Sequence, residues 1–168
     1  MTHKSILIIF TRNPILGKVK TRLAKAVGKK TALDIYLFLL QKTKEVTQNV
    51  HCDKVIFYSQ EILENDLWNT TTYKKDLQVG NHLGTKMNHA FETCFKDKYD
   101  KVVLIGSDLY DLEASHIEEA FEKLEKNEVV IGPATDGGYY LIGLKKTYPE
   151  IFQNKNWGTS SVRKDTLK

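Results

Sequence analysis

The chain has 168 residues, a length typical of about one domain and sufficient for a buried core. Hydrophobic residues make up 41% and charged residues 27%, a composition that excludes an intrinsically disordered chain, and no apolar run reaches the roughly 18 residues of a membrane-spanning helix. The net charge of +4 is unevenly distributed, because residues 1–33 contain eight Lys or Arg and no Asp or Glu, which favours an anionic partner.

The N-terminus leads directly into strand-like sequence and lacks the longer apolar run and the cleavage site of a signal peptide. Cys52 and Cys94 form neither a metal-ligand spacing nor a redox motif. We therefore expect a cytoplasmic protein with no membrane partner.

Apolar segments alternate with amphipathic ones along the whole chain. Rich in Val, Ile, Leu and Phe without strict alternation, the apolar segments are typical of a largely parallel sheet buried on both faces. The alternation predicts an α/β sandwich with right-handed crossovers. We predict strands at 5–11, 54–59, 76–79, 101–105, 128–131 and 139–144, helices at 30–48, 84–96 and 113–127, and a short helix plus loop at 60–75.

A basic loop follows the first predicted strand. Pro14 and Gly17 favour a turn there, and the loop carries four basic residues within eleven positions, namely Arg12, Lys18, Lys20 and Arg22. Arginine gives bidentate phosphate contacts and lysine a compact charge, so the loop suits a diphosphate. It matches neither a P-loop nor a dinucleotide fingerprint. The alternative is a solvated basic turn.

A second glycine-containing loop leads from the strand at 76–79 into the next helix. Gly84 would allow a ligand to approach the backbone closely, and we assign it and Lys86 to the phosphate-binding set. His82 is a weaker candidate for a substrate contact, because a single histidine in a turn is more often exposed without a role.

Two carboxylates, Asp108 and Asp111, follow the apolar segment 101–105 after a Gly-Ser pair. The carboxyl end of a strand in an open α/β sheet is where ligands bind, and a carboxylate there commonly holds a divalent cation against phosphate oxygens. Asp108 and Asp111 are therefore candidate ligands of Mg²⁺ or Mn²⁺. The alternative for Asp108 is a cap of the helix at 113–127.

A third candidate acid, Asp136, begins an Asp-Gly-Gly turn between the last two predicted strands. Asp-Gly is common in hairpins for steric reasons alone. The functional alternative places Asp136 at the same sheet edge as Asp108, where it would share a metal or position an acceptor. Further along, Trp157 either covers a pocket or packs in the core, and Thr159 or Ser160 is a candidate cap of a final helix.

Four runs of the chain resemble the pattern of a family in the nucleotide-diphospho-sugar transferase (GT-A) superfamily, the DUF2064 group. Some members of this group are assigned as glycosyltransferases, including ones linked to arsenosugar biosynthesis. The resemblance covers nearly the whole chain. It implies a single nucleotide-binding domain, residues 1–168, with a three-layer α/β/α fold and a Rossmann-like, mixed but mostly parallel sheet. The runs are Phe10 to Leu23, Gly106 to Leu112, Gly132 to Leu144 and Trp157 to Ser160.

The resemblance also implies roles for individual residues. Asp108 corresponds to the metal-binding aspartate motif of the superfamily, and Arg12, Lys20 and Arg22 correspond to its phosphate-facing loop. Tyr110 stands where the family usually has proline. The family pattern also usually continues beyond residue 168 with a further acidic run, so we expect the natural protein to have a further C-terminal element.

These observations favour a metal-dependent glycosyltransferase that uses a nucleotide-sugar donor and a small-molecule acceptor, with Asp108 and Asp136 as the catalytic acids. Two alternatives remain open: a nucleotidyltransferase that releases pyrophosphate from an NTP, and a non-catalytic nucleotide-binding module. Nucleic-acid binding is disfavoured, because few aromatic residues are interleaved with the basic ones and no known binding module is present. The sequence does not indicate an oligomeric state.

Overall fold

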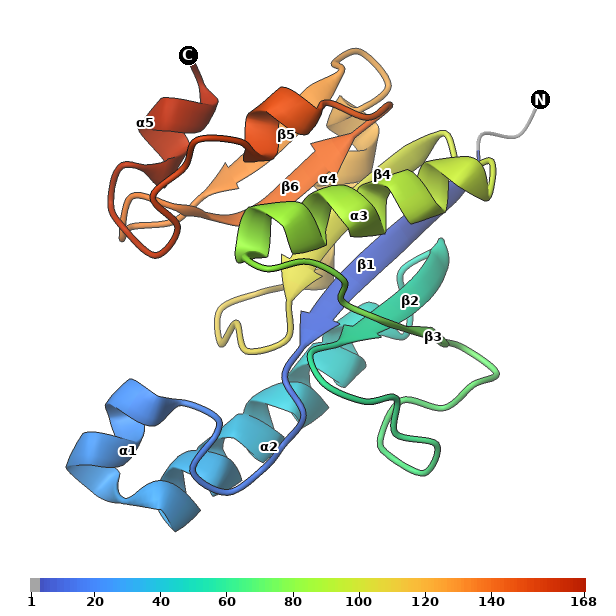
Figure 1. Cartoon of the computed structure of the whole chain (residues 1–168). Coiled ribbons are helices and arrows are strands. Elements are labelled where there is room, and N and C mark those ends of the chain that lie inside the picture. Colours follow the sequence, from blue (N-terminus) through green and yellow to red (C-terminus); the bar gives the residue numbers. More distant parts are fainter. Residues whose placement is uncertain (1–3) are drawn as a thin grey trace.

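Six strands form one sheet in the order β3-β2-β1-β4-β6-β5 in a computed structural model of the protein, which describes residues 4–168 (Figure 1). The first four strands in this order are parallel, whereas β6 is antiparallel to both β4 and β5. The three-layer α/β sandwich with a mixed, mostly parallel sheet is thus confirmed. The strands are β1 (Ser5–Thr11), β2 (Asp53–Tyr58), β3 (Lys74–Leu77), β4 (Lys101–Gly106), β5 (Val129–Pro133) and β6 (Tyr139–Leu144).

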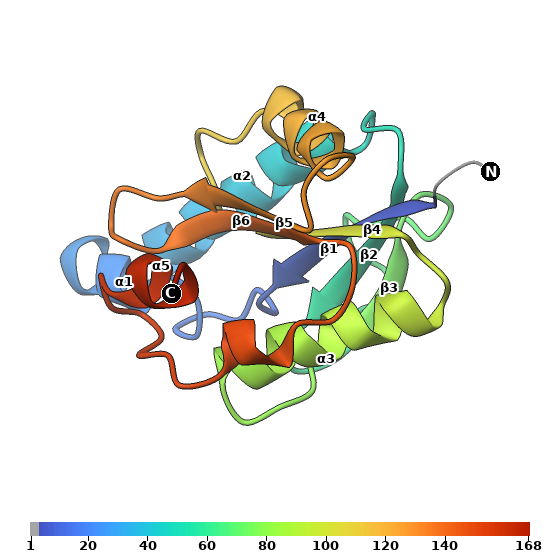
Figure 2. The same cartoon turned by 90° about the horizontal axis from the view of Figure 1, so that it is seen from above.

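Helices cover both faces of the sheet, with α2 and α4 on one face and α3 and the 3-10 helix η1 on the other (Figure 2). The helices are α1 (Thr21–Val27), α2 (Lys29–Thr47), α3 (Leu83–Lys96), α4 (Ala114–Lys123), η1 (Pro149–Phe152) and α5 (Val162–Thr166). Within residues 4–168, no helix is both long and apolar enough to cross a membrane.

The alternation of side chains along β1 builds the two cores of the molecule. Leu7 and Ile9 belong to the buried cluster that also contains side chains of α2 and α4. Ile6 and Ile8 point to the other face and belong to the cluster that contains side chains of α3. All four side chains are at most 2% exposed, which explains why this central strand has no polar face in the sequence.

The strand order reverses direction between β1 and β4. From β1 the chain proceeds to β2 and β3 on one side, and then crosses to β4 on the other. Phe10 pairs with Gly106, so the carboxyl ends of both strands lie at the same sheet edge. In open α/β sheets this switch point is where ligands bind.

The segment 60–75 differs from the prediction, because residues 60–73 contain no helix and 74–75 belong to β3. The side chain of Asp66 accepts a hydrogen bond from the backbone of Trp68 at 3.0 Å, and that of Asn69 accepts one from the backbone of Thr72 at 3.0 Å. Such local side-chain bonds compete with helical ones. Trp68 and Tyr73 are buried edge to face, which fixes this loop against the core.

Candidate functional site

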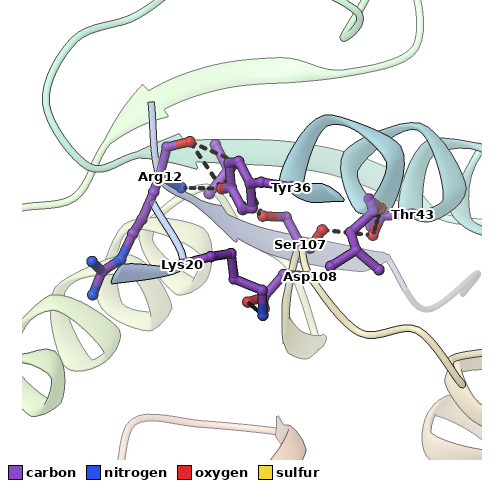
Figure 3. Close-up of polar contacts among 8 residues, drawn as sticks. Arg12, Lys20, Tyr36, Thr43, Ser107 and Asp108 are labelled. Carbon is purple, nitrogen blue, oxygen red and sulfur yellow. Dashed lines mark hydrogen bonds and ion pairs between the residues drawn. The ribbon is translucent and has the colours of Figure 1, made fainter. Parts of the chain in front are cut away.

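A buried network of hydroxyl groups joins the ends of β1 and β4 to helix α2 (Figure 3). The hydroxyl of Tyr36 lies 3.2 Å from the Thr11 hydroxyl and 3.3 Å from that of Ser107. The Ser107 hydroxyl donates to Thr11 Oγ1 at 3.0 Å, and Thr43 of α2 donates to the Ser107 carbonyl at 2.8 Å. All four side chains are buried, so these bonds satisfy polar groups that would otherwise be costly in the core.

The same tyrosine fixes the backbone that presents the first basic side chain of the site. The Arg12 backbone N–H donates to Tyr36 Oη at 2.9 Å, and Tyr36 Oη donates to the Arg12 carbonyl at 2.9 Å. The Arg12 guanidinium extends away from this network (Figure 3). Asn13, next in the chain, is 3% exposed and donates through Nδ2 to the Glu61 carbonyl at 2.8 Å. The loop after β1 is therefore held from two sides.

A large basic cavity lies at the carboxyl ends of β1 and β4. Its volume is about 1110 Å³, just above the roughly 300–1,000 Å³ typical of small-molecule sites. Asp108 is the one carboxylate among its lining residues in the described chain. The cavity suits an anionic ligand, because several positively charged side chains line it. The basic side chains of this lining are those of Arg12, Lys18, Lys20, Arg22 and Lys86.

Lys20 and Asp108 form an ion pair inside this cavity, with 3.0 Å between Nζ and Oδ2 (Figure 3). The two side chains are 30% and 41% exposed, so the pair remains in contact with solvent. Lys20 has a left-handed backbone, φ 48° and ψ 44°, which is uncommon for a residue with a side chain. The backbone is thus held in an unfavourable conformation where it presents this cation.

A second, smaller cavity adjoins the basic one. Its volume is about 370 Å³, and Asp136 lies on its wall together with Trp157. Phe10, Arg22 and Leu83 line both cavities, so the two share a wall. The Asp136 carboxylate is exposed and accepts the Gly138 N–H at 2.9 Å within the predicted hairpin turn.

Tyr139, at the start of β6, also lines the second cavity. Burial raises the pKa of its phenol to about 12. The phenol is therefore neutral at physiological pH and is a poor base.

The structure brings most of the predicted site residues together and places three of them elsewhere. Arg12, Lys20, Arg22, Lys86 and Asp108 share the basic cavity, and Asp136 lies in the adjoining one. Gly17, Gly84 and Asp111 line neither cavity in the described chain.

Gly84 has a packing role in α3. A Cβ there would lie 2.4 Å from the Phe152 carbonyl oxygen and 2.7 Å from Trp157 Nε1. Trp157 thus packs against α3, as one of the two alternatives predicted, and it also lines the second cavity.

Two helix caps that were considered as alternatives or candidates from the sequence do not form in the structure. Asp108 does not cap α4, which begins at Ala114 with Glu113 as N-cap; the Glu113 N–H donates to His116 Nδ1 at 3.0 Å. The N-cap of α5 is Ser161 rather than Thr159 or Ser160, and its side chain makes no capping bond.

His82 is the N-cap of α3. Its Nδ1 accepts the Thr85 N–H at 3.4 Å. The histidine thereby has a structural role at the beginning of this helix.

Sequence analysis missed the residues that support the site, above all Tyr36 and Ser107. Tyr36 lies within the helix predicted at 30–48 and was not among the predicted site residues. A tyrosine in such a position is itself a signal, because a buried phenol usually has a hydrogen-bond partner. Ser107 directly precedes Asp108, but its partners lie 71 and 96 residues away in the chain.

The chain has the fold of a nucleotide-diphospho-sugar transferase. Residues 40–159 match a family described as uncharacterized proteins conserved in bacteria (DUF2064). The chain belongs to this family.

Among solved structures, the chain is similar to a candidate nucleotide-diphospho-sugar transferase from Desulfovibrio desulfuricans G20. The two are 34% identical with a TM-score of 0.89, and the match covers 99% of this chain and 74% of the other. No protein of curated function matches the chain.

More distant structures share the fold alone. A 4-diphosphocytidyl-2C-methyl-D-erythritol synthase from Anaerococcus prevotii DSM 20548 is 13% identical with a TM-score of 0.57, over 96% of this chain and 82% of that one. A cytidylyltransferase from Leptospira borgpetersenii is 13% identical with a TM-score of 0.51, over 90% and 63% of the respective chains.

Proposed function

We propose that the protein is a glycosyltransferase that binds the diphosphate of a nucleotide-sugar in the basic cavity and transfers the sugar to a small-molecule acceptor. One observation carries the proposal: among residues 4–168, five basic side chains and a single carboxylate line a cavity at the switch point of the sheet. The 34% identical Desulfovibrio protein, described as a candidate nucleotide-diphospho-sugar transferase, supports it.

The basic side chains would stabilise the leaving nucleoside diphosphate. A single pair of unit charges about 4 Å apart contributes roughly 4 kcal/mol at an effective dielectric constant near 20, before the cost of desolvation. Arg12 and Arg22 offer bidentate contacts, and Lys20 offers a compact charge. Because charge on the diphosphate increases as the sugar departs, these contacts strengthen in the transition state.

Asp136 is positioned to accept the proton of the acceptor. Its carboxylate lines the second cavity, which shares a wall with the basic one. A hydroxyl bound there would face the sugar held across that wall. General base catalysis by a carboxylate commonly contributes about 10²–10⁴ in rate.

The site fits a divalent cation that arrives with its substrate. Within residues 4–168, no three His, Cys, Asp or Glu side chains come together as a metal site. Mg²⁺ is often held by one or two carboxylates completed by substrate phosphates and water, and Asp108 supplies such a carboxylate. Asp111, three residues further along, is exposed and is the second candidate. The ion would neutralise charge on the diphosphate.

Two measurements test this function. Thermal shift with nucleoside diphosphates, nucleotide-sugars and NTPs, each with and without Mn²⁺, reports base preference, phosphate count and metal dependence, since a ligand stabilises the fold by mass action. Product analysis then identifies the reaction. Release of nucleoside diphosphate supports glycosyl transfer, release of pyrophosphate indicates nucleotidyl transfer instead, and binding without turnover indicates a nucleotide-binding module.

A further inference from the structure

The walls of the second cavity differ in chemistry from those of the basic cavity. Apart from its aromatic and glycine residues, Arg22, Asp136 and Thr159 are the polar contributors in the described chain. Such a lining disfavours a highly charged occupant, because charge removed from water needs compensating partners. Its aliphatic side chains are those of Leu83, Met87, Leu104, Leu141, Ile142 and Val162.

The end of β4 separates the two cavities. Gly106, the last residue of the strand, lines the second cavity, whereas Ser107 and Asp108 line the basic cavity. A ligand in the second cavity therefore lies next to the proposed diphosphate site. Asp136 is on the wall of the second cavity. This is the arrangement expected of two substrates that react across a shared boundary.

We propose that the second cavity binds the acceptor and that the acceptor is an uncharged alcohol with an apolar body. The proposal rests on the proposed function, which places the donor in the basic cavity. The volume of about 370 Å³ lies near the lower end of small-molecule sites, which limits the occupant to a small molecule.

The chemistry of this arrangement is balanced without a further reactant. The acceptor oxygen forms a bond to the anomeric carbon of the donor sugar, and its proton passes to the Asp136 carboxylate. The bond between that carbon and the diphosphate oxygen breaks, and the electron pair leaves on the nucleoside diphosphate. The cations of the basic cavity face the charge that develops there.

A sugar or a phosphorylated molecule fits this cavity less well. A sugar carries a hydroxyl on most of its carbons, and each buried hydroxyl needs a partner. Beyond the tyrosine hydroxyls and the indole N–H of Trp157, the lining offers the three polar side chains Arg22, Asp136 and Thr159. A phosphorylated acceptor would find a single cation, Arg22, which the basic cavity shares.

Saturation-transfer NMR on the full chain tests the inference. The probes are 2-phenylethanol and cyclohexanol as apolar alcohols, with glycerol and glycerol 3-phosphate as polar and phosphorylated counterparts. Thr159→Trp places a bulky side chain at an exposed position of this wall. Thr70→Trp, at an exposed position that lines neither cavity in the described chain, is the matched control. Thermal shift with nucleoside diphosphates runs on the same samples.

We expect the apolar alcohols to bind the natural protein and the Thr70→Trp variant, and to bind Thr159→Trp at least about tenfold more weakly, a change of about 1.4 kcal/mol. Stronger binding of glycerol or glycerol 3-phosphate, no binding of the apolar alcohols, or equal binding in Thr159→Trp would overturn the inference. Diphosphate binding with any of these results leaves the proposed function standing. Alcohol binding without diphosphate binding contradicts the proposed function, and the acceptor role with it.

Discussion

Lys20 reaches Asp108 across 88 positions of the chain, with 3.0 Å between Nζ and Oδ2, from a backbone held at φ 48° and ψ 44°. A left-handed conformation costs a residue with a side chain about 1–3 kcal/mol and tends to occur at functional sites. The strained position thus coincides with the cation that pairs with the candidate metal ligand. Because a bound phosphate would compete with Asp108 for this cation, we infer that ligand binding rearranges the pair.

Replacing Lys20 with glycine should separate stability from ligand binding. Lys20→Gly relieves the left-handed backbone and should stabilise the fold by up to about 1 kcal/mol, whereas loss of an exposed ion pair costs about 0–1 kcal/mol. Nucleoside diphosphate affinity should fall about tenfold. Lys98 has φ 66° and lines neither cavity in the described chain, so Lys98→Gly is the control. Urea unfolding and calorimetric titration measure both effects; an equal affinity loss in both variants would contradict the role of Lys20.

Removing the buried hydroxyl of Tyr36 should loosen the whole site. Tyr36→Phe leaves the Arg12 backbone groups without the hydroxyl that bonds both at 2.9 Å. We expect a loss of about 1–3 kcal/mol in the free energy of unfolding and weaker diphosphate binding. Tyr110 is 61% exposed, so Tyr110→Phe should change stability by less than about 0.5 kcal/mol. Similar losses in the two variants would show that the network does not support the site.

The hairpin turn beside Asp136 should tolerate no side chain at Gly137. Its φ is +90°, and a Cβ would lie 2.2 Å from the Ser160 carbonyl oxygen. Gly158 has a similar φ of +83° but open space around it. Gly158→Ala should therefore cost only backbone strain, about 1 kcal/mol, and Gly137→Ala more than about 2 kcal/mol. Urea unfolding measures the loss of stability in both variants. Equal losses would mean that the backbone at Ser160 shifts at little cost to make room for the added Cβ.

The strands that could be predicted from the sequence are those whose apolar residues are buried on both faces. The bounds of β1 and β6 were predicted correctly, because Ile, Leu and aromatic residues dominate them. The edge strand β3 begins two residues earlier than predicted, since Lys74 and Lys75 make its start look polar. Lys75 is held there by the Leu63 carbonyl, which its Nζ contacts at 2.5 Å. A partner twelve residues away in a loop leaves no local pattern.

The candidate site likewise has residues that could be predicted from the sequence and residues that could not. Basic and acidic side chains at strand ends could be identified from the sequence, because the charges are concentrated there. The hydroxyl network could not, because Tyr36 and Ser107 meet only after β4 has paired with β1. Gly84 was misleading for a related reason. Its need for space comes from Phe152 and Trp157, 68 and 73 positions further along the chain, and local sequence does not reveal those contacts.

Stability should fall as pH rises above about 9, and the buried thiol of Cys94 should account for part of the decline. Burial raises its pKa from 9.0 to about 12. Below pH 9 the thiol is protonated in both states, so its contribution is fully present. Above pH 9 the unfolded chain loses this proton while the folded chain keeps it up to about pH 12. The difference costs about 1.4 kcal/mol per pH unit.

Urea unfolding on either side of pH 9 measures this slope. Cys94→Ala should flatten the decline by the amount that one thiol contributes. Val102→Ala removes volume from the same buried cluster without a titrating group, so it should lower stability equally at every pH. An unchanged slope in Cys94→Ala would mean that other groups cause the decline.

Asp136 and Asp108 should affect different steps of the reaction. In the natural protein the Asp136 carboxylate accepts the Gly138 N–H at 2.9 Å. The amide oxygen of Asp136→Asn can accept the same bond, so the turn and the diphosphate affinity should be retained. The rate of sugar transfer should nevertheless fall by about 10²–10⁴, because an amide cannot take the acceptor proton.

Asp108→Asn should instead remove the part of diphosphate affinity that depends on Mn²⁺. Calorimetric titration with and without Mn²⁺, together with single-turnover rates, separates the two variants. Full turnover in Asp136→Asn would exclude it as the base, and an unchanged Mn²⁺ effect in Asp108→Asn would place the cation elsewhere.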